Sequence, residues 1–171
     1  MALLRGVNVG TKPRIRMSDL VTWLRESGLE HVQTYINSGN VVLEHPQNID
    51  VAGRVREALS ENAGVEVPVI VRTASELAVV VANNPYPGAG PTHLHVSFLE
   101  AVPDEATLRS ATTLDWRPEE FTVCGRDVYL HLPHGLGESR LAPRLSVIKG
   151  ATTRNWNTVL ALDEMVRRVE H

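Results

Sequence analysis

The spacing of hydrophobic positions changes repeatedly along the chain, and these changes predict its elements. Apolar, β-branched runs typical of strands occupy residues 2–9, 32–36, 41–44 and 67–71. Between them, apolar residues recur at helical spacing after Ser18 and after Asp50, two good capping residues, and glycines follow both runs. The Asn-Ser-Gly-Asn segment at residues 37–40 is typical of a hairpin turn. The first part of the chain is therefore predicted to be β-α-β-β-α-β, the ferredoxin-like order.

The second part repeats this order loosely. Helices are predicted at residues 75–82, 104–111, 139–148 and 154–169, and strands at 93–99, 121–124 and 128–132. We therefore predict an α+β fold of two tandem ferredoxin-like halves with mainly antiparallel sheets. The halves span residues 1–82 and 93–171 and form one compact unit, because only the short breaker segment at 83–92 separates them. The helical faces predict six core residues: Leu20, Leu24, Val55, Leu59, Leu160 and Val166.

Composition narrows the class of protein. Of the 171 residues, 43% are hydrophobic and 22% are charged, which is ordinary globular usage. A formal charge of -3 argues against broad nucleic-acid binding, although a local basic patch stays open. The single cysteine, Cys124, cannot form an internal disulfide, so we expect a reducing cytoplasmic location and a small, buried thiol. No apolar run approaches the roughly 18 residues of a membrane span, so we expect no membrane partner.

A glycine-bearing, basic segment follows the first predicted strand, and we call residues 5–12 the start loop. Its backbone N–H groups, with Arg5, Asn8 and Lys12, could hold a phosphate or a carboxylate. The segment matches neither the Walker A pattern nor G-x-G-x-x-G. The alternative is a plain strand-to-helix turn in which Asn8 bonds to the backbone.

A second polar segment, residues 149–158, is the late polar run. We expect it at the start of the last helix, where Thr152 or Thr153 would cap the helix and Arg154 would favour an anion. Trp156 could stack on a ring or pack into the core. We predict that the start loop and the late polar run meet around one ligand. The candidate ligand-binding residues are Arg5, Asn8, Lys12, Lys149, Thr153, Arg154, Asn155, Trp156 and Asn157.

The histidines do not suggest a metal site at this stage. His93 and His95 share a strand face and His131 with His134 lies near a hairpin end, but neither pair has Cys, Asp or Glu at ligand spacing. We therefore expect no metal and no cofactor. The sequence also shows no catalytic triad or paired carboxylates, so the catalytic residues, if any exist, stay unknown.

Three segments at the start, in the first third and near the end of the chain form a recognisable set: Leu4-Arg5-Gly6-Val7-Asn8-Val9-Gly10, Thr34-Tyr35-Ile36-Asn37-Ser38-Gly39-Asn40-Val41-Val42 and Ala151-Thr152-Thr153-Arg154-Asn155-Trp156-Asn157-Thr158-Val159. In this order and spacing they resemble the DUF1697 family, a set of bacterial proteins of unknown function. The resemblance implies an α+β fold with ferredoxin-like halves and brings no established activity. The chain departs from the family pattern at Asn37, where many relatives have Gln, and at Thr11, where a second Gly is common.

Three functional hypotheses follow. The leading one is a binding protein for an anionic or nucleotide-like small molecule. RNA is a weaker partner, because the strands lack the aromatic pairs that stack bases. The alternatives are an enzyme with unidentified catalytic groups and a structural or interaction protein whose polar segments join the two halves. Burial of Arg5, Arg154 and Asn155 would favour the structural alternative, and an open cleft would favour the ligand.

Overall fold

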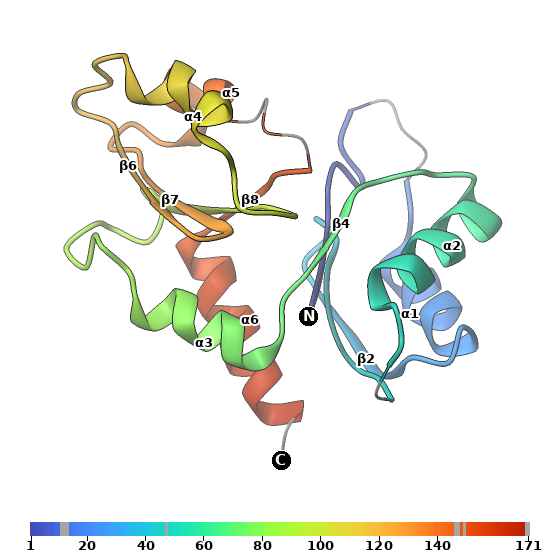
Figure 1. Ribbon diagram of the computed structural model, residues 1–171. Helices are drawn as coiled ribbons and strands as arrows, with labels where there is room; N and C mark the ends of the chain where they lie inside the picture. The colour runs from blue at the N-terminus through green and yellow to red at the C-terminus, as the bar shows by residue number, and fades with distance from the viewer. Residues whose placement is uncertain (11–13, 47, 146–147, 149, 170–171) are drawn as a thin grey trace. The chain divides into compact units, whose positions relative to one another are not determined.

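The computed structural model describes residues 1–10, 14–46, 48–145, 148 and 150–169. It is an α+β fold with two four-stranded antiparallel sheets (Figure 1). The chain divides into two compact units, residues 1–77 with 162–171 and residues 78–161. These limits differ from the predicted halves, because the end of the chain groups with the first unit.

The first unit carries its sheet and two covering helices. The elements are β1 (Ala2–Leu4), α1 (Met17–Glu26), β2 (Glu30–Tyr35), β3 (Asn40–Glu44), α2 (Val51–Ala63) and β4 (Val69–Val71). The strand order is β2-β3-β1-β4, and α1 and α2 lie on one face of this sheet (Figure 1). The core between them includes Leu4, Leu20, Leu24, Val55 and Leu59. Thus four of the six predicted core residues pack together here.

Local signals explain the bounds of α2. The Asp50 carboxylate accepts a hydrogen bond of 2.9 Å from the Gly53 amide, as expected for an N-cap. Gly64 ends the helix in a left-handed conformation, φ 62°, which glycine adopts without strain. Both predicted ends of this helix are confirmed.

The second unit has the same element order. It contains β5 (Leu94–Phe98), α4 (Glu105–Thr112), β6 (Glu120–Cys124), β7 (Asp127–His131), α5 (Leu141–Leu145) and β8 (Thr152–Asn155), with strand order β6-β7-β5-β8. A short 3-10 turn, η1 (Leu136–Glu138), precedes α5. Two helices, α3 (Ala74–Ala82) and α6 (Trp156–Val169), contribute residues to both units. No helix among the described residues is long and apolar enough to cross a bilayer.

Two sequence predictions at the beginning of the chain are wrong. The first strand ends at Leu4 rather than at residue 9, because Gly6 and Asn8 turn the backbone to φ 69° and 59°. Ser18 is not the N-cap of α1. The helix begins at Met17, and its N-cap, Arg16, makes no side-chain capping bond.

Three predictions in the second half also need correction. Residues 152–155 form strand β8 and not the start of a helix, and α6 begins at Trp156. Leu160 is 41% exposed and therefore not a core residue, whereas Val166 is buried as predicted. Cys124 is exposed rather than buried, because it lies at the end of β6 beside the hairpin turn.

Candidate functional site

Asn8 fixes the geometry of the start loop. Its side-chain Nδ2 donates to the Ile15 carbonyl at 2.8 Å and to the Asn37 carbonyl at 3.1 Å, and its Oδ1 accepts from the Ile15 amide at 2.7 Å. Asn tolerates the φ of 59° better than most side chains do. Asn8 therefore clamps the segment before α1 to the β2–β3 turn, as the backbone-bonding alternative predicted.

The β2–β3 turn packs closely on the end of β1. The Leu4 amide donates to the Gly39 carbonyl at 2.8 Å. A Cβ on Gly39 would lie 2.7 Å from the Cβ of Leu4, and the φ of Gly39 is 76°. Glycine is needed here for both reasons. The turn predicted at residues 37–40 thus also holds Asn37 beside the start loop.

A cavity of about 440 Å³ opens beside this clamp. We call it the Asn8 pocket, and its described lining residues are Asn8, Arg14, Ile15, Arg16, Met17, Ser18 and Asn37. Both arginines and Asn37 are exposed, whereas Ile15 is buried beneath them. The pocket therefore presents two guanidinium groups, the Asn37 amide and a hydroxyl group at the N-terminus of α1, while the Asn8 amide is already bonded to backbone.

The electrostatics of the Asn8 pocket favour an anion. The N-terminus of α1 carries a partial positive charge, and the side chain of its N-cap residue, Arg16, makes no capping hydrogen bond. Asp19, in the first helical turn, partly offsets this charge and accepts a 3.2 Å hydrogen bond from the Ser18 hydroxyl. Among the described lining residues there is no carboxylate, imidazole or thiol to transfer a proton. The described lining therefore offers positive charge and hydrogen-bond donors rather than proton-transfer groups.

Asn8 was predicted from the sequence as a site residue, whereas Arg14 and Arg16 were not. A detectable signal was present: two arginines flank an isoleucine just before a helix, so a buried Ile15 puts both guanidinium groups on the exposed side. Arg5, which was predicted, is half-buried, and its backbone amide donates to the Pro68 carbonyl at 3.0 Å. Lys12 and Lys149 lie outside the described residues.

The late polar run is largely built into the second sheet. The Arg154 side chain is 9% exposed, and its Nη1 donates to the Thr152 hydroxyl at 2.8 Å and to the Thr153 carbonyl at 2.9 Å. Burial lowers the pKa of Arg154 to about 10, so it stays charged at neutral pH. The Thr153 hydroxyl lies 2.6 Å from that of Ser97. These contacts are those of a structural element.

The remaining predicted residues begin α6. Asn155 accepts a 2.9 Å hydrogen bond from the Thr158 amide and thus does the capping that was expected of Thr152 or Thr153. Trp156 is buried and Asn157 is exposed. Because the start loop and these residues belong to different units, their meeting around one ligand stays a prediction.

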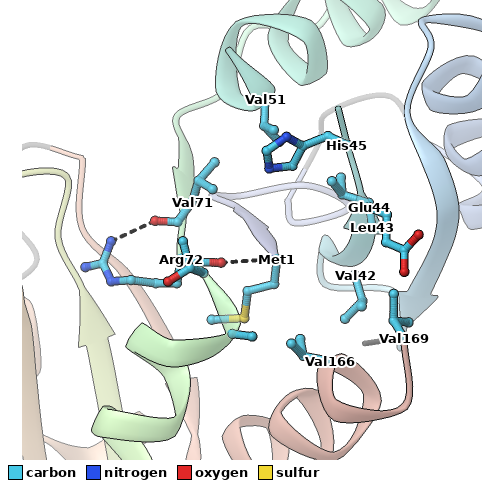
Figure 2. Close-up of a pocket in the computed structure, with 12 residues that line it drawn as sticks. Met1, Val42, Leu43, Glu44, His45, Val51, Val71, Arg72, Val166 and Val169 are labelled. Atoms are coloured by element: carbon cyan, nitrogen blue, oxygen red, sulfur yellow. Dashed lines mark hydrogen bonds between the residues drawn. The ribbon is translucent and has the colours of Figure 1, made fainter. Parts of the chain in front are cut away.

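The first unit has a second, more apolar cavity of about 360 Å³ (Figure 2). Valines from β3, α2, β4 and α6 form much of its wall: Val42, Val51, Val71, Val166 and Val169. Arg72, also at this cavity, is 1% exposed, and its Nη1 donates to the Val71 carbonyl at 3.0 Å. The Met1 amino group also donates to a backbone carbonyl here, and Glu44 adds a carboxylate to the lining.

One buried histidine lies in the second sheet. His95 on β5 is 5% exposed, and its Nδ1 has no hydrogen-bond partner among the described residues. Burial lowers its pKa, so it is neutral at physiological pH. In the strand register it lies opposite Asn155 and Leu130.

Comparisons with known proteins agree with the fold and bring no activity. The family model described as "Protein of unknown function (DUF1697)" matches residues 1–129, a range that includes every described residue of the Asn8 pocket. The solved structure of the conserved bacterial protein SP0830 from Streptococcus pneumoniae is similar, with a TM-score of 0.78, 20% sequence identity and 96% of each chain covered. At that identity the likeness concerns the fold alone. No curated protein matches the chain.

Proposed function

The chain belongs to the DUF1697 family, whose function is unknown, and we propose that it binds a phosphate-bearing, nucleotide-like anion in the Asn8 pocket. The observation that carries the proposal is that Arg14, Arg16 and Asn37 line one open cavity at the N-terminus of α1, where the N-cap side chain makes no capping bond.

The chemistry of the lining residues favours phosphate. Arginine matches the oxygens of phosphate with paired N–H donors, and a helix N-terminus adds backbone N–H groups and a favourable dipole. Asn37 supplies a further exposed amide. Asn8 supplies rigidity, because its amide is already bonded to Ile15 and Asn37.

The size of the pocket favours more than a bare phosphate ion. Its volume of about 440 Å³ lies in the range of small-molecule sites, roughly 300–1,000 Å³. Ile15 and Met17 supply apolar surface for a sugar or a ring. The acidic net charge of the chain favours a discrete anion over a long nucleic acid.

Two further inferences, one on the fold of each unit and one on location, accompany this function. We infer that each unit is a ferredoxin-like fold, because in both sheets the first strand lies between the third and the fourth in a β-α-β-β-α-β order. We also infer a reducing location such as the cytoplasm, since the lone Cys124 is exposed and would oxidise readily elsewhere. The structural alternative retains support at Arg154, whose Nη1 donates to Thr152 and Thr153 of its own strand.

Ligand-induced stabilisation tests the proposed function. The melting temperature of the full chain would be measured with inorganic phosphate, with ADP and with adenosine at constant ionic strength. We expect ADP to raise it, because a ligand at about 100 times its Kd stabilises the folded state by about 2.7 kcal/mol. Adenosine, without phosphate, should have little effect.

Two variants make the test specific. The double variant Arg14→Gln, Arg16→Gln removes both guanidinium groups and should abolish the ADP shift with the fold intact by circular dichroism. Arg56→Gln is the matched control, since Arg56 is exposed on α2 of the same unit. An ADP shift that survives in the double variant, or is lost equally in the control, would disprove the site.

A further inference from the structure

The β2–β3 hairpin contains an irregularity that gathers three side chains. Glu30 pairs with Glu44, but the next pair is Gln33 with Val42, so β2 contains one residue more than β3 at this point. His31 lies in this bulge with φ 48°. In a regular strand His31 would face away from Glu30, whereas a bulge redirects side chains.

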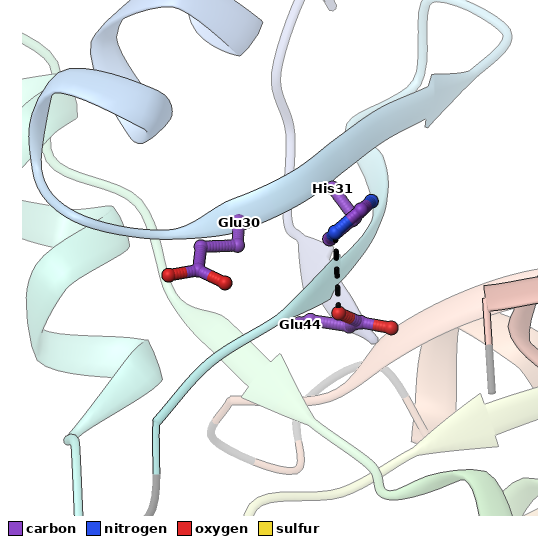
Figure 3. Close-up of side chains that lie close together, drawn as sticks. All are labelled: Glu30, His31 and Glu44. Carbon is purple, nitrogen blue, oxygen red and sulfur yellow. Dashed lines mark ion pairs between the residues drawn. The ribbon is translucent and has the colours of Figure 1, made fainter.

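The bulge brings His31 to the two carboxylates. One ligand atom from each of Glu30, His31 and Glu44 lies within 4.8 Å of the others. The Nε2 atom of His31 is 3.6 Å from a carboxylate oxygen of Glu44, and Figure 3 shows Glu30 close beside this pair. Donors bound to a single zinc ion lie 2.0–2.2 Å from it and hence within about 4 Å of one another, so small side-chain rotations would complete a site.

The arrangement is unfavourable without a cation. Like charges at directly opposed positions of two strands destabilise the pairing, and Glu30 and Glu44 occupy such positions. The His31 side chain is 66% exposed and that of Glu44 is 41% exposed, so hydrophobic burial does not explain why they gather. A left-handed backbone at a non-glycine residue adds strain. A bound cation would offset the carboxylate repulsion.

We propose that Glu30, His31 and Glu44 bind a divalent transition-metal ion, with zinc as the reference ion. One imidazole and two carboxylates suit zinc and its neighbours, whereas calcium and magnesium prefer oxygen ligands alone. Three protein ligands leave at least one position for water, as in open zinc sites. The site is separate from the Asn8 pocket in its residues and does not depend on the proposed anion.

No metal was expected from the sequence, because the histidine pairs His93 with His95 and His131 with His134 have no Cys, Asp or Glu at ligand spacing. Within the described residues, three potential metal ligands converge at the hairpin instead. A useful comparison is His131 on β7, whose Nδ1 lies 3.2 Å from a carboxylate oxygen of Glu120 on β6. That pair has the same residue types across a hairpin, so it is a natural control.

Zinc titration of the full chain tests the proposal. The protein would carry no affinity tag, would be stripped with a chelator and would be titrated with zinc by calorimetry. Cobalt absorption would report the coordination geometry. The variant His31→Asn removes the imidazole, and asparagine tolerates the left-handed backbone. His131→Asn is the matched control.

We expect one saturable zinc ion in the wild type and in His131→Asn. His31→Asn should bind zinc at least about tenfold more weakly, since even outer-shell changes cost 10–100-fold. Equal affinity in His31→Asn and His131→Asn, or no saturable binding in the wild type, would overturn the proposal.

A second variant separates metal binding from any effect on folding. Glu30→Gln removes one ligand and also one of the two repelling charges. The metal-free protein should therefore melt slightly higher than the wild type, while zinc should stabilise it less. If Glu30→Gln lowered the metal-free melting temperature and left the zinc-induced shift unchanged, Glu30 would be structural and the three-ligand site would be wrong.

Discussion

Replacing Asn8 with glycine and with alanine tests whether this residue clamps the start loop and separates the two reasons for its presence. Its side chain makes three hydrogen bonds, two with Ile15 and one with Asn37. Its backbone has φ 59°. Glycine removes the bonds and tolerates the backbone, whereas alanine removes the bonds and is also strained.

The magnitudes follow from these contacts. A net 0.5–1.5 kcal/mol for each hydrogen bond, with the exposed one at the low end, gives a loss of roughly 1.5–3.5 kcal/mol for Asn8→Gly. Alanine at this φ adds about 1–2 kcal/mol of strain. It regains about 0.4–1 kcal/mol because its unfolded chain is less flexible than that of glycine. Asn8→Ala should therefore be less stable than Asn8→Gly by up to about 1.5 kcal/mol.

Urea unfolding followed by tryptophan fluorescence and circular dichroism measures these differences. Trp23 on α1 packs against the core of the first unit and should report on the unit that contains Asn8. Asn48 is the control, since it has φ 70° and is exposed. There, alanine should again be less stable than glycine, but glycine itself should change little.

Two outcomes would refute this reasoning. If Asn8→Gly lost less than about 0.5 kcal/mol, the range of ordinary surface changes, the three bonds would not clamp the loop. If Asn8→Ala were clearly more stable than Asn8→Gly, the left-handed backbone would not be imposed by the fold.

Three further predictions concern the core and the pH dependence of stability. Leu24→Ala should lose roughly 2–5 kcal/mol of unfolding free energy because Leu24 is fully buried, whereas Leu160→Ala, at a position 41% exposed, should lose under about 1 kcal/mol. Equal losses in urea unfolding would contradict the assigned helix faces. Burial raises the pKa of Glu119, but hydrogen bonds from the Arg140 and Leu141 amides and the Ser139 hydroxyl outweigh it and hold the pKa below its usual 4.5. The stability that the Glu119 carboxylate contributes is therefore full above pH 4.5 and is lost as pH falls through the folded-state pKa. In Glu119→Gln, unfolding free energy should be lower at pH 7 and should fall less steeply below pH 4.5, and an unchanged slope would argue against the three bonds. Burial lowers the pKa of His95 below 6.5, so the wild type should lose stability as pH falls from 6.5 through the folded-state pKa. His95→Leu should flatten this part of the plot of unfolding free energy against pH, and an unaltered plot would mean that His95 is not the titrating group.

Much of the first unit was predictable because its signals are local. The Asp50 carboxylate caps α2 by accepting a hydrogen bond from the amide of Gly53, three positions later, and Gly64 ends the same helix through its own backbone freedom. The turn at residues 37–40 depends on Gly39 and its neighbours. Such interactions join residues close in sequence, so composition and spacing carry them. The α+β class and the antiparallel sheets followed from these elements.

Strand β8 was not predictable from its own residues. Thr-Thr-Arg-Asn has little of the hydrophobic alternation of a strand, and its polar residues resemble a helix start. It becomes a strand because it pairs with β5, where Val96 lies opposite Arg154. That pairing joins positions more than 50 residues apart. It buries the Arg154 guanidinium, which was predicted from the sequence to lie in an open site.

The sequence by itself determined which residues could hold an anion or an ion, and the tertiary structure decided which of them meet. Asn8 was identified from its loop, but its pocket needs Arg14 and Asn37, which come from two other segments. In the same way, Glu30 and Glu44 become partners through strand pairing, and a bulge adds His31. The reason is physical, because residue type sets the charge and hydrogen-bonding capacity of a side chain. Its neighbours in space depend instead on strand register and chain closure, which no short stretch of sequence determines.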